Sequence, residues 1–277
     1  MAMVINTNVA AINSQRKLND TNNNLSTSME RLSSGLRVNS AKDDAAGMAI
    51  SNKMTSQIRG MTVATRNAND GISLAQTAES AMGTMTETMQ RMRDLAVQSS
   101  NDAGVTAADR DKLQTEFKQL NDELTRIITN TEFNGKKIIN GSLKTGLAVQ
   151  VGANTTSDNQ IKISIANLAS TIVKVTSATV ASTAAKALSA ITQLDAAIKS
   201  IDTARSKLGA IQNRFTTTIT NLQSSIENQS AARSRITDTD FAQETANLSR
   251  NQILQQAGTA MLAQANQGGQ SVLSLLR

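Results

Sequence analysis

The chain has 277 residues, a formal net charge of +6 at pH 7, 39% apolar residues, and no Pro, Cys, His, Trp or Tyr. Without Cys or His it has neither a thiolate nucleophile nor an imidazole base, and it cannot form a zinc site from nitrogen or sulfur ligands, so we expect no enzymatic activity and no cofactor. Its basic residues are scattered among acids without stacking aromatics, and no stretch approaches the roughly 20 apolar residues of a membrane span, which argues against nucleic-acid binding and membrane insertion.

Residues 1–39 carry a narrow apolar stripe at helical spacing. Its members follow alternating steps of four and three residues, as in a coiled-coil seam with one polar defect at Asn22. The stretch between Asn19 and Thr27 is almost wholly polar. A seam this thin predicts a helix that needs another surface to cover it. The seam comprises Leu18, Leu25, Met29, Leu32 and Leu36, and Ile5, Val9 and Ile12 show the same spacing earlier.

A second helix is predicted from Ser40, because a Ser cap is followed three residues later by Asp43. Its stripe keeps its phase through Asn69-Asp70-Gly71, a sequence that normally favours a turn, so we expect one long helix rather than two. The helix is predicted to end at residues 101–104. Its many methionines lie at seam spacing, which favours core filling over an adaptable recognition surface.

Thr106 and Asp109 form the cap of a third predicted helix, whose seam is Leu113, Phe117, Leu120, Leu124 and Ile127. The period then changes to two, which predicts a β-hairpin near residues 138–165 with a polar loop over 152–160. Its alternating apolar residues are Leu147, Val149 and Val151, then Ile161, Ile163 and Ile165. Residues 170–185 are small and carry little pattern, so we expect an exposed connector there.

The helical seam returns from Ala187 through Ile226, and residues 238–277 form a last predicted helix. Its apolar seam residues are Leu254, Leu262, Leu273, Leu275 and Leu276. The expected fold is mainly α: a long antiparallel, coiled-coil-like helix bundle with paired N- and C-terminal segments and a small β-hairpin in the middle.

The two terminal segments bury too little apolar surface to offset the conformational entropy lost when their helices form. We therefore expect both to be disordered in a free monomer and to become ordered when neighbouring copies cover their seams. This predicts a helical assembly subunit. A soluble coiled-coil adaptor or signalling rod that does not polymerise is the alternative.

Several segments resemble bacterial flagellins, and the similarity covers residues 1–165 and 185–277. The segments that carry it are residues 1–8, 30–50, 66–73, 208–215, 230–236, 252–258 and 274–277. The resemblance implies a secreted, extracellular subunit of the flagellar filament, exported unfolded through the flagellar type III apparatus and polymerised at the distal tip. Its implied partners are copies of itself, flagellar cap and hook-associated proteins, and a flagellin export chaperone. A hook–filament junction protein is the alternative within this resemblance.

The resemblance also implies a layered domain organisation. Residues 1–43 and 238–277 would form the inner core, and residues 44–170 and 185–237 would form the outer tube. Residues 171–184 would be a short variable surface connector, where many flagellins insert outer domains. Some of those insertions hold a zinc protease, which the absence of His excludes here.

One segment, residues 90–97, resembles the part of flagellins that an animal Toll-like receptor grips. The implied contact residues are Arg91, Leu95 and Glu116. The alternative is that this face only packs against neighbouring subunits. The end of the chain, Leu275-Leu276-Arg277, likewise resembles the part sensed by a cytosolic inflammasome receptor, with core packing as the alternative.

Flagellins are often O-glycosylated on their outer surface, and hydroxyl residues are abundant in the corresponding part of this chain. No sequon dictates this modification, so ordinary solvated hydroxyls are the alternative. The candidates are Thr155, Thr156, Ser164, Ser170, Thr171, Ser177, Thr179, Ser182 and Thr183.

Overall fold

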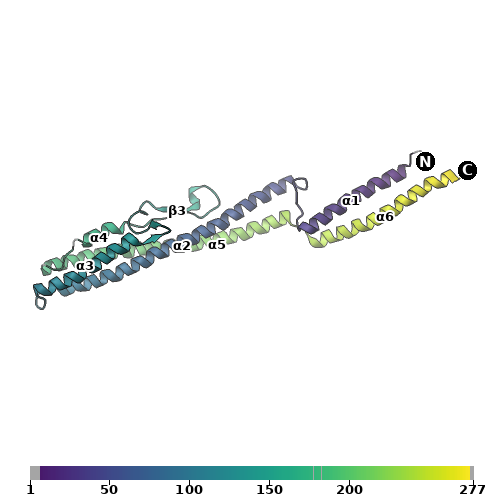
Figure 1. Cartoon of the computed structure of the whole chain (residues 1–277). Coiled ribbons are helices and arrows are strands. Elements are labelled where there is room, and N and C mark those ends of the chain that lie inside the picture. The colour runs from purple at the N-terminus through teal and green to yellow at the C-terminus, as the bar shows by residue number, and fades with distance from the viewer. Residues whose placement is uncertain (1–6, 177, 182, 275–277) are drawn as a thin grey trace. The chain divides into compact units, whose positions relative to one another are not determined.

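The computed structural model describes residues 7–176, 178–181 and 183–274 (Figure 1). These residues are mainly helical with two small antiparallel β-hairpins, which confirms the predicted fold class. None of their helices is long and apolar enough to cross a bilayer. The elements are α1 (Val9–Ser34), α2 (Ala45–Ser99), α3 (Ala107–Asn130), β1 (Glu132–Phe133), β2 (Lys136–Lys137), β3 (Leu147–Gln150), a 3-10 helix (Ser157–Asn159), β4 (Gln160–Ile163), α4 (Leu168–Thr176), α5 (Ala184–Thr237) and α6 (Phe241–Ser274).

The chain divides into two compact units. The terminal unit comprises residues 1–56 and 228–277, and the central unit comprises residues 57–227. Almost all of the buried apolar side chains in the described residues belong to the central unit; Val38 is the exception. The two units therefore differ sharply in how much apolar surface they bury.

Helix α2 runs without a break through Asn69-Asp70-Gly71, which confirms the prediction of one long helix. Gly71 is buried against the ring of Phe215 on α5, so the glycine serves close packing between two helices rather than a turn. Polar side chains of α2 and α5 also form hydrogen bonds to each other further along the two helices. Arg93 Nε donates to Asp195 Oδ1 at 2.7 Å, and Gln212 Nε2 donates to Glu79 Oε2 at 2.9 Å.

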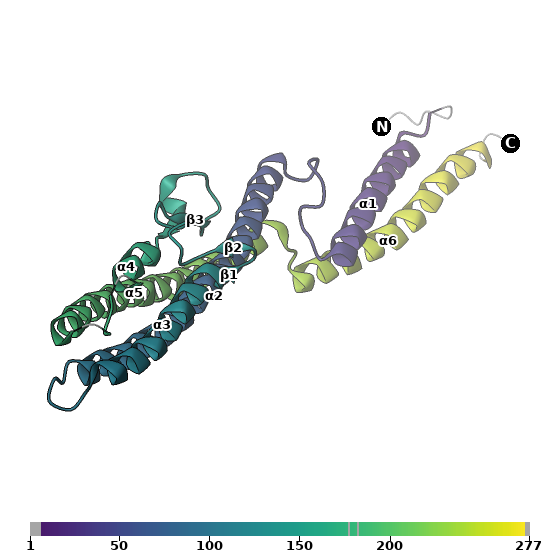
Figure 2. The same ribbon diagram turned by 60° about the vertical axis from the view of Figure 1, so that its left-hand side comes forward.

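The core of the central unit lies among α2, α3 and α5, which run side by side in both views (Figures 1 and 2). Methionines of α2 fill much of it, as their seam spacing predicted: Met82, Met85, Met89 and Met92 are fully buried. From α3, Phe117, Leu124 and Ile127 are buried in the same core, which confirms the predicted seam of this helix. The unbranched thioether side chains fill the irregular space between long helices where few aromatics are available.

The predicted cap of α3 is confirmed. The backbone N–H of Asp109 donates to Thr106 Oγ1 at 3.3 Å, and the Thr106 hydroxyl donates to Asp109 Oδ2 at 2.7 Å. The predicted hairpin is also confirmed, because β3 pairs antiparallel with β4 in a register that places Leu147 opposite Ile163 and Val149 opposite Ile161. A second, very short hairpin joins β1 to β2 through Asn134 and Gly135, both in the left-handed region.

Residues 170–185 are not the exposed connector that their composition suggested. Helix α4 covers residues 168–176 and buries Ile172 and Val175, and Val180 is fully buried after it. The backbone N–H of Val180 donates to Gln114 Oε1 of α3 at 2.7 Å, and its carbonyl accepts from Ser99 Oγ of α2. Packing against α3 and α2 therefore fixes a segment whose own sequence carries a weak pattern.

The start of α2 also differs from the prediction. Asp43 accepts hydrogen bonds from the backbone N–H groups of Asn39 and Ser40 and from the Ser40 hydroxyl, so the predicted Ser–Asp pair closes a turn rather than a helix. The helix begins after Asp44, whose Oδ1 accepts from Gly47 N at 2.8 Å. The chain thus uses two successive acids, one for the turn and one for the cap.

Candidate assembly surface

Helices α1 and α6 form an antiparallel pair in the terminal unit (Figures 1 and 2). At one end Asn8 Nδ2 donates to the carbonyl of Ala265 at 2.8 Å, and further along Gln255 Nε2 donates to Asn22 Oδ1 at 2.9 Å. Between these levels, Leu18 Cδ1 lies 3.2 Å from the position that a Cβ on Gly258 would take. The glycine permits close approach of the two helices at this point.

The two connections of the terminal unit are tied together by main-chain hydrogen bonds. Arg37 N donates to Thr237 O at 2.7 Å, and Thr239 N donates to Gly35 O at 3.0 Å. Gly35 ends α1 with a φ of 72°, a conformation that favours glycine. Hydrogen bonding with the Ser234 and Thr237 side chains lowers the pKa of Asp238, which lies in the same ladder.

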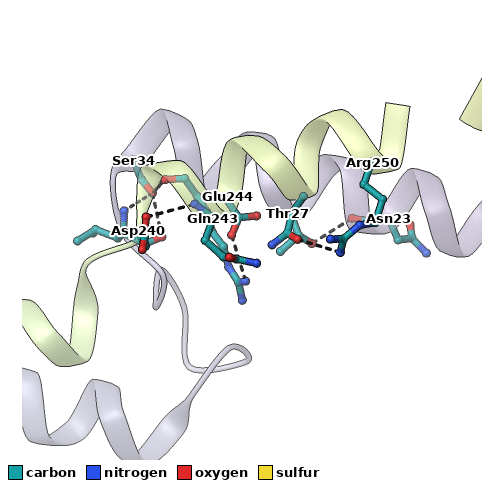
Figure 3. A network of polar contacts seen from close by, with 10 residues as sticks. Asn23, Thr27, Ser34, Asp240, Gln243, Glu244 and Arg250 are labelled. Carbon is teal, nitrogen blue, oxygen red and sulfur yellow. Dashed lines mark hydrogen bonds and ion pairs between the residues drawn. The ribbon is translucent and has the colours of Figure 1, made fainter. Parts of the chain in front are cut away.

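Polar groups join α1 and α6 next to these connections (Figure 3). Asp240 caps α6, since its Oδ1 accepts from Ala242 N at 2.9 Å and from Gln243 N at 3.2 Å. One turn later, Glu244 is buried and its carboxylate lies 4.0 Å from the guanidinium of Arg31 on α1. A buried acid beside a half-exposed Arg fixes the register of the pair at this end.

The predicted seam residues turn partly toward the helix pair and partly to solvent. Leu18, Leu25, Leu32, Leu36 and Leu262 are half-buried. Met29 is 51% exposed and Leu254 is 48% exposed. Ile5, Leu275 and Leu276 lie outside the described residues. Leu273 lies in the last turns of α6, where the helix is described but the side chains are not. No described seam residue is fully buried, so the pair leaves its own apolar stripe incompletely covered.

Besides Met29 and Leu254 of the seam, further large apolar side chains of the terminal unit are exposed. A folded monomer rarely leaves so many large apolar side chains in solvent without a partner. Ile50 precedes Met54 by four residues and so continues the apolar stripe of α2, whereas Ile253 adjoins Leu254 but was not part of the predicted seam. The exposed apolar surface comprises Val9, Ile12, Met29, Ile50, Phe241, Ile253, Leu254 and Met261.

In the central unit, Arg91 and Glu116 form an ion pair between α2 and α3. Arg91 Nη2 lies 2.6 Å from Glu116 Oε1, and the two side chains are 56% and 43% exposed. Leu95, the third candidate for receptor contact, is only 2% exposed and belongs to the core. The side chain of Leu95 therefore packs inside the subunit, and its role as a receptor contact stays a prediction.

The candidate glycosylation residues differ in accessibility. Thr155, Thr156, Ser164, Ser170 and Thr183 are exposed. Thr179 is half-buried and its hydroxyl donates to Gln114 Oε1 at 3.2 Å, which makes it a poorer acceptor for a glycan. The side chain of Thr171 is not among those described, and Ser177 and Ser182 lie outside the described residues.

Comparison with protein families gives two matches that together cover most of the chain. Residues 5–144 match the bacterial flagellin N-terminal helical region, and residues 191–276 match the bacterial flagellin C-terminal helical region. Among similar proteins, a flagellin of Halalkalibacterium halodurans is 46% identical over 275 residues, which span 99% of this chain and 100% of that protein. The flagellar filament 33 kDa core protein of Treponema phagedenis is 44% identical over 288 residues, with coverage of 99% and 100%.

Solved structures give a consistent result. The crystal structure of Bacillus cereus flagellin superposes with a TM-score of 0.50 at 29% identity and covers 61% of this chain and 94% of that chain. A putative flagellar hook-associated protein from Vibrio parahaemolyticus superposes with a TM-score of 0.60, covering 71% of this chain and 100% of that one. At 13% identity, the second likeness concerns the fold alone.

Proposed function

Because the chain belongs to the bacterial flagellin family and is a structural subunit of the extracellular flagellar filament, we propose that its terminal unit provides the surface through which its copies assemble. The observation that carries this proposal is the concentration of exposed apolar side chains on α1 and α6. Burying each of them contributes roughly 1.5–3 kcal/mol, which is ample for a repeated contact between identical subunits.

The layered organisation follows from this proposal. Residues 1–43 and 238–277 form the inner core of the filament, and residues 44–170 and 185–237 form the outer tube. The difference in burial supports this assignment, because the central unit has its own apolar core and α1 and α6 do not.

We infer further that α1 and α6 become ordered on assembly. Val38 is the one buried apolar side chain among the described residues of the terminal unit, so little apolar burial offsets the entropy lost in forming two long helices there. Neighbouring copies in the filament supply the missing burial. The free subunit then remains soluble until it reaches a growing end.

Before assembly, the exposed apolar residues of α6 need a protective partner. Ile253, Leu254 and Met261 are suited to an apolar groove on an export chaperone, which binds an amphipathic helix through such residues. Flagellar cap and hook-associated proteins are the proposed neighbours of the first and last subunits in the filament.

The Arg91–Glu116 pair is the proposed contact for a Toll-like flagellin receptor, because both side chains are accessible on adjacent helices. The exposed hydroxyls of Thr155, Thr156 and Ser164 are the preferred candidates for O-glycosylation. An intact mass equal to that of the unmodified polypeptide would exclude the modification.

The assembly proposal is tested with two variants that differ only in the helix face they change. Leu25→Asp/Leu32→Asp introduces two charges into the half-buried seam of α1, and Ser26→Asp/Ser33→Asp introduces the same charges at exposed positions one residue away. Elongation from filament seeds, measured by sedimentation, should cease in the first variant and persist in the second. Normal elongation of the Leu25/Leu32 variant would refute the seam assignment.

A further inference from the structure

Methionine is the only readily oxidised type of side chain in this protein. The chain has 11 Met and no Cys, Trp, Tyr or His. A two-electron oxidant of the peroxide class therefore reacts with the methionine sulfur atoms. The solvent accessibility of each sulfur decides which of them react.

The described methionines fall into sharply different environments. Met82, Met85, Met89 and Met92 are fully buried in the central core, and Met61 is 6% exposed. Met48 and Met54 are half-buried. Met29 and Met261 are 51% and 61% exposed, which makes them the two accessible thioethers of the described residues.

Both exposed methionines lie beside the contact between α1 and α6. Met29 follows Leu25 by four residues and precedes Leu32 by three, so it lies on the same face of α1 as these half-buried seam residues. Met261 lies one turn after Gly258, the residue of α6 that packs closely against Leu18 of α1. The two thioethers thus occupy different ends of the same helix pair.

We propose that Met29 and Met261 are oxidation sites through which a peroxide-class oxidant blocks the assembly of the free subunit. This inference rests on the proposed role of the terminal unit in assembly. The sulfur lone pair attacks one peroxide oxygen, and the S–O bond forms as the O–O bond breaks. The second oxygen takes up the proton of the first and leaves as water. The thioether loses two electrons and the peroxide gains them.

The product disrupts packing because a sulfoxide oxygen is a strong hydrogen-bond acceptor. At positions flanked by apolar side chains, its burial against a neighbouring copy leaves that acceptor unpartnered. In an assembled filament the same two sulfurs are covered and are protected from the oxidant, so oxidation acts on subunits that have not yet assembled.

Peptide mapping by mass spectrometry tests the chemical part of this proposal. The full-length free subunit is treated with hydrogen peroxide, and sulfoxide is quantified at every methionine over time. Met29 and Met261 should react before Met82, Met85, Met89 and Met92, and assembled filaments should show little reaction at the first two positions. Equal rates at exposed and buried methionines in the free subunit would overturn the proposal.

Seeded elongation tests the functional part. Oxidised wild type should elongate at least about tenfold more slowly than untreated protein, whereas Met29→Leu/Met261→Leu treated in the same way should elongate as it did before treatment. Met85→Leu, which removes a buried thioether instead, should remain as sensitive as wild type. Equal sensitivity of the Met29/Met261 variant would place the damage elsewhere and refute the inference.

A second measurement covers the case in which the double Leu variant does not assemble even untreated. Methionine sulfoxide reductases should then restore elongation of oxidised wild type in step with loss of sulfoxide at Met29 and Met261. Restoration without that change would contradict the proposal. Failure of the untreated wild type to elongate refutes the assembly role itself and is recognised before any oxidant is added.

Discussion

Gly71 of α2 and Phe215 of α5 lie in direct contact, so that a Cβ placed on Gly71 would be 2.8 Å from Phe215 Cζ. A real Cβ cannot take that position unless the ring or a helix moves. The methyl group of an alanine would ordinarily favour helix formation, but at position 71 it would clash with Phe215 of α5.

We predict that Gly71→Ala destabilises the central unit. Overpacking costs about 1–3 kcal/mol, against a gain of about 0.5–1 kcal/mol from the better helix propensity of Ala. Gly83→Ala on the same helix is the matched control, because no atom lies within 4 Å of its added Cβ, and it should gain stability. Urea unfolding followed by circular dichroism measures both. Equal stabilisation by the two substitutions would contradict the packing argument.

The long helices and the β3–β4 hairpin could be predicted from the sequence because their periods extend over many residues. The apolar stripe keeps its helical spacing through Gly71, and this correctly predicted a continuous helix although Asn69-Asp70-Gly71 favours a turn. At the start of α2, local capping chemistry was misleading, since Ser40 and Asp43 satisfy the same hydrogen bonds in a turn. A Ser–Asp capping pair indicates that free backbone N–H groups find a hydrogen-bond acceptor, but it does not show whether a turn or a helix follows.

Helix α4 was missed although its buried residues Leu168, Ile172 and Val175 have helical spacing. Nine residues with Ser, Thr and Val are too few to form a stable helix alone, and the helix depends on packing partners distant in the sequence. The burial of Leu95 was missed for a different reason. A resemblance of sequence carries no information on helix face, whereas its spacing from Met92 and Met85 would have placed it in the core.

We predict that Gln114→Leu destabilises the segment after α4. The substitution leaves the buried N–H of Val180 without the acceptor that now lies 2.7 Å away, which costs about 1–3 kcal/mol. Gln119→Leu, at an exposed position of the same helix, is the control and should change the free energy of unfolding by less than about 0.5 kcal/mol. Hydrogen exchange at the Val180 amide should accelerate only in the first variant.

Acid should loosen the turn between α1 and α2. Hydrogen bonds from Ser40, first its backbone N–H and then its hydroxyl, lower the pKa of Asp43 below its ordinary value. A folded-state pKa below the unfolded one means that the stabilisation is present above the unfolded value, about 3.9, and is lost as the pH falls through the folded value.

The chemical shift of the Ser40 amide, followed by nuclear magnetic resonance, reports this titration. It should be constant above about pH 5 and should change below about pH 4. Asp43→Asn removes the titrating group, so in that variant the change should disappear while other acids still titrate. Persistence of the same transition in the Asn variant would assign it to another carboxylate.

Substitutions at two of the receptor candidates, Leu95 and Arg91, should separate binding from stability. Leu95→Ala removes a buried side chain and should cost about 2–5 kcal/mol, so any loss of receptor signalling would reflect unfolding. Arg91→Ala removes one partner of an exposed ion pair and should cost less than about 1 kcal/mol. A signalling assay paired with urea unfolding tests this. Undiminished signalling by a fully stable Arg91 variant would exclude that residue as a contact.

Ile253→Ser should weaken filament assembly without destabilising the free subunit. Ile253 is 66% exposed, so its side chain contributes little to the fold of one copy. When a neighbouring copy covers it, its loss removes about 1.5–3 kcal/mol per subunit, equivalent to a rise of about 10- to 150-fold in the subunit concentration needed for growth.

Sedimentation after seeding measures that concentration, and circular dichroism of the free subunit checks that its helix content is unchanged. Gln252→Ser, at the adjacent exposed position of α6, controls for the substitution itself and should leave the growth threshold near that of wild type. An unaltered threshold for Ile253→Ser would mean that this face of α6 stays in solvent after assembly. The contacts between copies would then have to be assigned to the α1 residues Val9 and Ile12, whose exposure is comparable.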